Sequence, residues 1–272
     1  MTASARNRRG SRPPVPIERI SPPDADTFRE KYVRTSRPVV LRELARDWVA
    51  TREWTPETLR RRFGDRLVQV AAIAGRRGVN DPRMGVAYRA IRLSEYIDRL
   101  VSPAEPEFSL AMPVETHIPE LLDDLPRLNY CSRARWFRHR LWLTPDGVAS
   151  PLHRDPPENL YVQIVGRKRF VLYSRDATRC MYSHSLWSRT PNYSAVDPER
   201  PDPDRFPRFA AAVGYEAELL PGDVLYLPSF WWHYGRAEGT SLSVNIWWAD
   251  LRPLLLMILA AQAYLKLRQF KL

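Results

Sequence analysis

The sequence predicts a mostly β domain, a barrel or a sandwich, with helices at its flanks. Seven short apolar or β-branched runs, separated by turn residues, follow one another from about residue 108 onward. Such spacing is typical of sandwiches and barrels and differs from that of parallel sheets with crossover helices. The 272 residues, 44% of them hydrophobic, suffice for one barrel with added elements. We therefore expect a single domain over residues 15–250, with its barrel core at about 108–250.

The region before the barrel alternates helix and strand signals. Its clearest helix begins after Thr55, a favoured N-cap residue, and has Pro56 at its first position. Gly64 stands just past the end of this helix, where glycine is common. The expected elements are helices over 21–33, 54–64 and 92–101 and strands over 38–44 and 67–73.

The barrel strands are expected where apolar and β-branched residues cluster between turn residues. A hairpin is expected at Gly-Arg-Lys-Arg-Phe, residues 166–170. The polar, proline-rich segment 174–212 has no clear period, and loops of such length in a compact domain are usually functional or disordered. The expected strands are 108–112, 139–144, 159–166, 168–174, 215–223, 224–228 and 241–248.

The two ends of the chain differ from the domain between them. Residues 1–14 predict a disordered basic arm without the apolar stretch of a secretory signal. Residues 251–272 predict an apolar helix too short to span a membrane. A helix that is apolar almost all round needs a cover, and we expect a homodimer in which a second copy supplies it. The alternative is burial of this helix within its own subunit.

The charge balance leaves two interpretations open. Lysine and arginine outnumber aspartate and glutamate by 42 to 31, a net charge of +11 that favours polyanions such as tRNA or acidic peptides as partners. The excess is nearly all arginine and is scattered along the chain, as is common in proteins from GC-rich genomes. Cys131 and Cys180 lack metal-type spacing, which fits a reducing cytoplasm, and no membrane association is expected.

Three residues form a candidate metal site. His153 and Asp155 lie two apart beside a predicted strand, so both side chains project to one face. Pro156 and Pro157 follow at once and end strand pairing. His233, after Pro-x-x-Trp-Trp, supplies a third ligand. Two imidazoles and one carboxylate leave three positions open, as in the facial triad of non-haem iron(II) oxygenases.

The chain resembles the cupin-like branch of the Jumonji-C oxygenases, especially the group containing the asparaginyl hydroxylase of hypoxia-inducible factor. The resemblance covers residues 17–250 and rests on the His-x-Asp pair, the Pro-Gly-Asp turn, the Pro-x-x-Trp-Trp-His stretch and a lysine between the two histidines. It implies a double-stranded β-helix, that is, a cupin-like jelly roll, with an N-terminal helical elaboration. It also implies iron(II), the cosubstrate 2-oxoglutarate and O2.

The resemblance implies the cosubstrate residues as well. Lys168 matches the lysine that binds the distal carboxylate of 2-oxoglutarate, and burying that carboxylate without a partner would cost several kcal/mol. Ser150, Asn159 and Asn245 match polar residues around the metal. Taken singly, these four residues are also common as turn, hairpin or strand polar groups.

One departure from the family concerns a tyrosine. The best-known relatives add a tyrosine hydroxyl to the distal carboxylate from the strand that here reads Pro-Glu-Phe-Ser-Leu-Ala-Met, and Phe108 is expected in its place. Tyr161 or Tyr130 are candidates to replace the lost hydroxyl.

The resemblance implies hydroxylation of an unactivated C–H bond in a protein, peptide or amino-acid-derived small-molecule substrate, with release of succinate and CO2. Three alternatives stay open: N-methyl-lysine demethylation, hydroxylation of a tRNA base, and a cupin that binds metal without turnover. Ordinary core or surface roles are expected for the other histidines, which are His117, His139 and His184.

Overall fold

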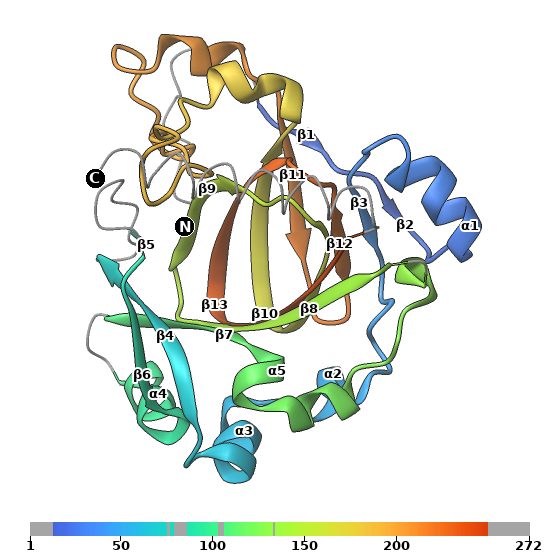
Figure 1. Cartoon of the computed structure of the whole chain (residues 1–272), viewed down its shortest axis with the longest axis vertical. Coiled ribbons are helices and arrows are strands. Elements are labelled where there is room, and N and C mark those ends of the chain that lie inside the picture. Colours follow the sequence, from blue (N-terminus) through green and yellow to red (C-terminus); the bar gives the residue numbers. More distant parts are fainter. Residues whose placement is uncertain (1–12, 75–76, 79–85, 103–105, 133, 250–272) are drawn as a thin grey trace, which may run out of the picture.

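The computed structural model describes residues 13–74, 77–78, 86–102, 106–132 and 134–249, and two long strands organise it (Figure 1). These strands are β10 (Glu158–Tyr173) and β13 (Trp232–Ala249), which pair antiparallel along most of their length. The first part of β10 pairs with β12 and the second part with β11. The start of β13 pairs with β9 and its end with β8. Each long strand therefore passes between the layer that contains β8 and β12 and the layer that contains β9 and β11, as in the expected jelly roll. We call these the first and the second layer of the barrel.

The remaining elements surround these two strands. The other strands are β1 (Val15–Pro16), β2 (Arg19–Ile20), β3 (Val39–Leu41), β4 (Leu67–Ala74), β5 (Arg77–Gly78), β6 (Tyr88–Arg92), β7 (Phe108–Pro113), β8 (Trp136–Thr144), β9 (Ala149–Arg154), β11 (Gly214–Leu219) and β12 (Val224–Leu227). The helices are α1 (Ala25–Phe28), continued by π-helical turns over Arg29–Val33, α2 (Val49–Glu53), α3 (Pro56–Phe63), α4 (Leu93–Leu100) and α5 (Val114–His117). Short 3-10 turns occupy Pro119–Asp124, Asn129–Cys131, Arg175–Cys180 and Pro207–Ala211.

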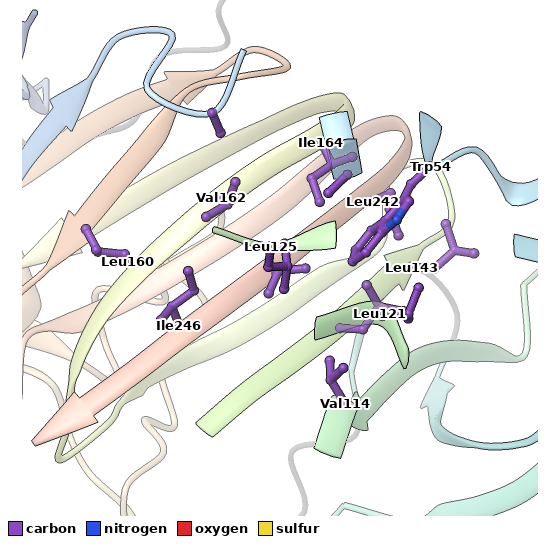
Figure 2. Packing of buried hydrophobic residues seen from close by; sticks show 14 of the residues in the cluster. Trp54, Val114, Leu121, Leu125, Leu143, Leu160, Val162, Ile164, Leu242 and Ile246 are labelled. Atoms are coloured by element: carbon purple, nitrogen blue, oxygen red, sulfur yellow. The ribbon is translucent and has the colours of Figure 1, made fainter. Parts of the chain in front are cut away.

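The largest apolar core lies outside the barrel, between one sheet layer and the helices. Leu160, Val162 and Ile164 of β10 are at most 2% exposed and belong to this cluster. Figure 2 shows them with Trp54 and Leu121 from the helical region. Each buried aliphatic side chain of this size contributes roughly 1.5 to 3 kcal/mol. The helical elaboration therefore stabilises the layer that carries polar residues on its other face.

The inner face of the same layer is polar. Side chains alternate along a strand, so Asn159, Tyr161 and Gln163 project away from the helices. Their register partners on β13 are also mostly polar, with Tyr161 opposite Asn245 and Gln163 opposite Ser243. All five are at most 5% exposed. A polar interior of this kind is typical of a binding site, because a barrel with an apolar core would be more stable.

The expected helices are confirmed where their end signals were strong. The Thr55 hydroxyl accepts a hydrogen bond from the Thr58 N–H at 3.1 Å, and the Thr55 N–H donates to the Thr58 hydroxyl. Gly64 is needed for space and not for a left-handed backbone, because a Cβ there would lie 2.5 Å from the Arg60 carbonyl oxygen. The helix expected over 92–101 is α4.

One expectation about the chain between 159 and 212 needs correction, and one is decided between its alternatives. The hairpin expected at 166–170 is absent, and β10 continues through it with register shifts between Gln163 and Arg167. The segment 174–212 is folded, and Met181, Phe206 and Phe209 pack with Trp232 in a buried cluster on the outer side of the second layer. Figure 1 draws this segment in yellow to orange, at the opposite end of the molecule from α3.

Some expectations concern residues that lie outside the described ones. They are the basic arm, apart from Pro13 and Pro14, and the apolar helix at 251–272 with the dimer it would support. Within the part of the chain that the structure describes, no helix has the length and apolarity needed to cross a membrane.

Candidate metal centre and cosubstrate site

The three predicted metal ligands converge at the end of the barrel. His153 is near the end of β9, Asp155 follows that strand directly, and His233 is the second residue of β13. The register of β9 and β13 places His153 opposite His233. One ligand atom from each residue lies within 4.8 Å of the others. The Asp155 carboxylate oxygen is 3.9 Å from His153 Nε2 and 3.8 Å from His233 Nε2.

Backbone hydrogen bonds fix how both imidazoles face the site. Nδ1–H of His153 donates to the Pro151 carbonyl at 2.7 Å, and Nδ1–H of His233 donates to the Trp231 carbonyl at 3.0 Å. This tautomer leaves the Nε2 lone pair of each ring free toward Asp155. Burial and the neighbouring His153 together lower the pKa of His233 to about 4. The ring of His233 is thus presented as a neutral ligand.

The loop that carries Asp155 is held by the segment before His233. The Phe230 N–H donates to the Asp155 carbonyl at 2.8 Å, and the Ser229 hydroxyl donates to the Pro156 carbonyl at 2.5 Å. Phe230 adopts a φ of 61°, a left-handed conformation that costs free energy in a bulky residue. The two ligand segments are therefore fastened to each other by backbone contacts.

Arg154 and Glu158 flank the metal ligands in the sequence, but both side chains contact residues other than these ligands. The Arg154 guanidinium stacks over the rings of Phe230 and Trp232, at 5.9 and 4.9 Å from the ring centroids. The Glu158 carboxylate accepts hydrogen bonds from the Tyr226 hydroxyl at 2.6 Å and the Ser229 N–H at 3.0 Å.

Lys168 is a buried cation without a carboxylate partner among the described residues. Its side chain is on β10 opposite Ala237 of β13 and Leu219 of β11, and the residue is 3% exposed. Burial lowers the pKa of its ammonium group to about 8, because the charged form loses its hydration. An ammonium group in such a place is stabilised by an anion, and none of the described carboxylates forms an ion pair with it.

The predicted amides are buried and lack hydrogen-bond partners in the described protein. Asn159 is 2% exposed, and neither its amide oxygen nor its amide nitrogen has a partner. The amide oxygen of Asn245 also lacks one. Buried polar atoms of native proteins are nearly always paired, so these atoms indicate a place for a polar ligand. Ser150 lines a cleft together with His153.

The expectation for Phe108 was wrong. Its ring belongs to the outer core, where the guanidinium groups of Arg89 and Arg99 each lie 5.7 Å from its centroid. Alternation along β7 turns Ser109 toward the barrel instead, 3.4 Å from the Thr144 hydroxyl.

Of the two candidate tyrosines, the structure places one inside the barrel and one outside. The Tyr161 hydroxyl lies 2.5 Å from the Ser243 hydroxyl, and its ring packs edge-on against Phe170. Tyr130 lies elsewhere, because its hydroxyl donates to the Pro23 carbonyl. Tyr161 stays a candidate for a cosubstrate contact.

No sequence pattern pointed to Tyr193, which the structure brings to the metal site. Its ring stacks on His153 with 5.1 Å between centroids and an interplanar angle of 19°. An isolated β-bridge to His153 places it there from the long segment 174–212. The other histidines have ordinary partners, as expected: His117 contacts the Leu67 carbonyl, His139 contacts Glu115 and His184 contacts Thr190.

A cleft extends from His153 across the inner face of the first layer. Tyr88, Trp142 and Tyr193 line it, and Ala71 and Ala111 form part of its floor. The cleft therefore joins the metal ligands to an aromatic wall.

Comparison with known proteins agrees with this arrangement. A family model described as a cupin-like domain matches residues 25–252. Lysine-specific demethylase 8 of Xenopus tropicalis is 33% identical over 239 residues, which cover 86% of this chain and 53% of that protein. Lysine-specific demethylase JMJ30 of Arabidopsis thaliana is 30% identical over 247 residues, which cover 86% of this chain and 55% of that protein. The chain thus spans about half the length of these two relatives.

A third relative is named for a role in tRNA and not for lysine demethylation. The tRNA wybutosine-synthesizing protein 5 of Danio rerio is 28% identical over 251 residues, which cover 84% of this chain and 73% of that protein. The same domain therefore occurs in proteins named for lysine demethylation and in one named for tRNA modification.

Proposed function

Since this chain belongs to the cupin-like domain family, in its Jumonji-C branch, we propose that it hydroxylates an unactivated C–H bond in a protein or peptide, using iron(II), 2-oxoglutarate and O2. The observation that carries this proposal is one barrel end that holds a facial set of two imidazoles and one carboxylate, together with a buried ammonium inside the same barrel that has no carboxylate partner among the described residues. The metal site alone would fit a binding protein. The added cation specifies an anionic cosubstrate.

The donor set fits iron(II). Two neutral imidazoles and a carboxylate on one side leave the opposite positions for exchangeable ligands, the arrangement that non-haem iron(II) oxygenases use. When bound, the iron and its cosubstrate supply the oxidising chemistry, and the protein supplies geometry and shielding. Fixed Nδ1 hydrogen bonds at His153 and His233 orient the ligand rings and keep their Nε2 atoms available.

The residues inside the barrel would bind and orient 2-oxoglutarate. Lys168 would pair with its distal carboxylate, since this ammonium is buried and lacks a carboxylate partner in the described structure. Asn159 and Asn245 would hydrogen-bond the end near the metal, and Ser150 would contribute its hydroxyl. Tyr161 would stand in for the missing tyrosine hydroxyl. The apolar side chains of Phe170 and Leu172 would exclude water from the bound cosubstrate.

An assay for succinate tests the proposal. The full chain is incubated with iron(II), ascorbate and 2-oxoglutarate, with and without cell extract, and succinate is measured by mass spectrometry. We expect iron-dependent succinate and a product 16 daltons heavier than its substrate. If 2-oxoglutarate stays unconsumed while iron binds, the chain is a metal-binding cupin without turnover.

Two finer alternatives are distinguished by their products. Removal of an N-methyl group begins with hydroxylation of that methyl and ends with formaldehyde, so formaldehyde formed with succinate would indicate demethylation. Hydroxylation of a tRNA base would add 16 daltons to a nucleoside, and tRNA binding would weaken steeply with salt.

A further inference from the structure

Arg140 lies on the inner face of β8, beside the aromatic wall of the cleft. Its Nη2 donates to the Gln69 side-chain oxygen and the Ala111 carbonyl, both at 3.2 Å, and to the Tyr88 hydroxyl at 3.5 Å. Its guanidinium lies 5.4 Å from the ring centroid of Trp142. These partners are all neutral, so they orient the guanidinium without neutralising its charge.

Buried donors near Arg140 lack acceptors. Arg140 Nε, Trp142 Nε1 and Trp247 Nε1 are buried and have no hydrogen-bond partner within the described structure. The strand register places all three side chains on one face, because Arg138 pairs with Trp247 and Trp142 with Ser243. An unsatisfied buried donor is costly. Three of them on one face predict a ligand that brings acceptor oxygens.

The cation is connected to the metal ligands through aromatic residues. Arg140 contacts Tyr88, and Tyr88 lines the same cleft as Tyr193 and His153. A substrate that enters the cleft would therefore meet Arg140 while its reacting carbon is near the metal.

No carboxylate faces Arg140 from the described elements around it. None of the cleft-lining residues is Asp or Glu, and Asp155 is a metal ligand. Glu115 binds His139 on the opposite face of β8. Position 71 on the neighbouring strand β4, where an acidic side chain could have balanced the charge, is alanine. A cationic substrate side chain would thus find repulsion in this cleft.

We propose that Arg140 is a specificity-determining residue that recognises an acidic side chain of a peptide substrate in the cleft beside His153. This inference rests on the proposed function and adds the substrate class to it. Arginine suits the task because its planar donor set matches a carboxylate. The Nε edge is free for this contact, and the indole N–H of Trp142 offers another donor nearby.

A peptide fits the described charges better than a nucleic acid does. Phosphate backbones are bound by tracks of unpaired cations. Many arginines of the described structure are instead paired with carboxylates, as in Arg60 with Asp98 and Arg167 with Glu218. Much of the net positive charge comes from residues 1–12 and 252–271, outside the described structure. The guanidinium of Arg140, next to the cleft-lining residues Tyr88 and Trp142, matches a single carboxylate.

The test measures binding of peptide pools that differ in one central residue. The full chain, loaded with Mn(II) and 2-oxoglutarate under nitrogen, is titrated with pools centred on Asp, Glu, Asn, Gln, Lys or Arg and followed by fluorescence anisotropy. We expect the Asp or Glu pool to bind about tenfold or more tightly than the Lys pool. Arg140→Gln should abolish this preference, Arg140→Glu should invert it and Arg140→Lys should keep part of it.

Arg89→Gln is the matched control. It removes the same charge from the opposite face of β6, next to Tyr88, where Arg89 is exposed over Phe108. We expect this variant to keep the acidic preference and the succinate formation of the wild type. Circular dichroism of each variant identifies those that fold.

Several results would overturn the inference. One is equal binding of acidic and basic pools, and another is an acidic preference that survives Arg140→Gln. Loss of 2-oxoglutarate binding in Arg140→Gln as large as in Lys168→Ala would assign Arg140 to the cosubstrate instead. Arg140-dependent binding of total tRNA, without peptide binding, would replace the peptide with RNA. An acidic preference without iron-dependent succinate would support the pocket and contradict the proposed oxygenase.

Discussion

Replacing Lys168 with methionine tests the cosubstrate site through stability as well as activity. Methionine keeps the length of the side chain and removes the charge that burial disfavours. Burial lowers the pKa of Lys168 from 10.5 to about 8, and each unit corresponds to about 1.4 kcal/mol. The free wild-type protein therefore carries a penalty of about 3 kcal/mol at neutral pH. The Lys168→Met variant should be more stable than the wild type by up to that amount.

The pH dependence of this penalty has a definite sign. The unfolded lysine binds its proton up to about pH 10.5, whereas the folded one releases it near pH 8. Stability of the wild type relative to the variant therefore rises with pH between about 8 and 10.5. Below about pH 8 the full penalty is present, and above about pH 10.5 it disappears. The advantage of Lys168→Met should follow the same course in thermal unfolding at several pH values.

The Lys168→Met variant should gain stability but lose affinity for 2-oxoglutarate. Loss of one partner of a buried ion pair costs on the order of 3 to 5 kcal/mol. Because about 1.4 kcal/mol of binding free energy corresponds to a tenfold change in affinity, even a third of this cost would weaken binding about tenfold. We expect the Michaelis constant for 2-oxoglutarate to rise by at least about tenfold in Lys168→Met. In the wild type, affinity should fall as the pH rises through about 8, because only the ammonium form pairs with the carboxylate.

The control is Arg167→Met, on the same strand. Arg167 is exposed and lies 3.3 Å from the Glu218 carboxylate, so its change should cost little stability and leave cosubstrate affinity as it is. The reasoning would be refuted by a Michaelis constant for 2-oxoglutarate that is the same in Lys168→Met and the wild type.

Three further predictions concern the metal, the packing and the assembly. Changing any one ligand of the triad to alanine should abolish iron-dependent turnover while circular dichroism shows a folded chain; retained turnover in Asp155→Ala would contradict this unless chloride replaces the carboxylate. Gly235→Ala should lower the free energy of unfolding by about 1 to 3 kcal/mol in urea, because its Cβ would lie 2.9 Å from the Phe170 ring. Wild-type stability would show that the ring can move. Light scattering should find a dimer for the intact chain and a monomer for one ending at Asp250; an intact monomer at tens of micromolar would make the dimer prediction wrong.

The sequence predicted two of the three metal ligands from a short local pattern. His153 and Asp155 needed only the alternation of a strand, and Pro156 marked where that strand ends. His233 needed the resemblance, since no local rule connects it to a strand eighty residues earlier in the chain. The register of β9 with β13 then brings the two histidines face to face.

The cleft beside His153 was beyond sequence reasoning because its residues come from distant elements. Tyr193 reaches His153 from a segment without periodicity, and Arg140 gains its position from the pairing of β8 with β7 and β13. Phe108 was misplaced for a related reason. A resemblance indicates which strand is involved. Which of two successive side chains in that strand faces the barrel interior depends on the pleat and the register, which the resemblance does not give.

Lys168 shows most clearly how register decides a site. Reading outward from Asn159 with a strict period of two places Gln163 and then Arg167 inside the barrel, and Lys168 outside. The structure has Lys168 buried and Arg167 exposed, because β10 shifts register between Gln163 and Arg167. Gly166 permits the shift: its φ is 71°, and a Cβ there would lie 2.1 Å from the Thr240 carbonyl oxygen. The irregular stretch between Gln163 and Arg167 therefore lets Tyr161 and Lys168, from the two layers, both lie buried inside the barrel.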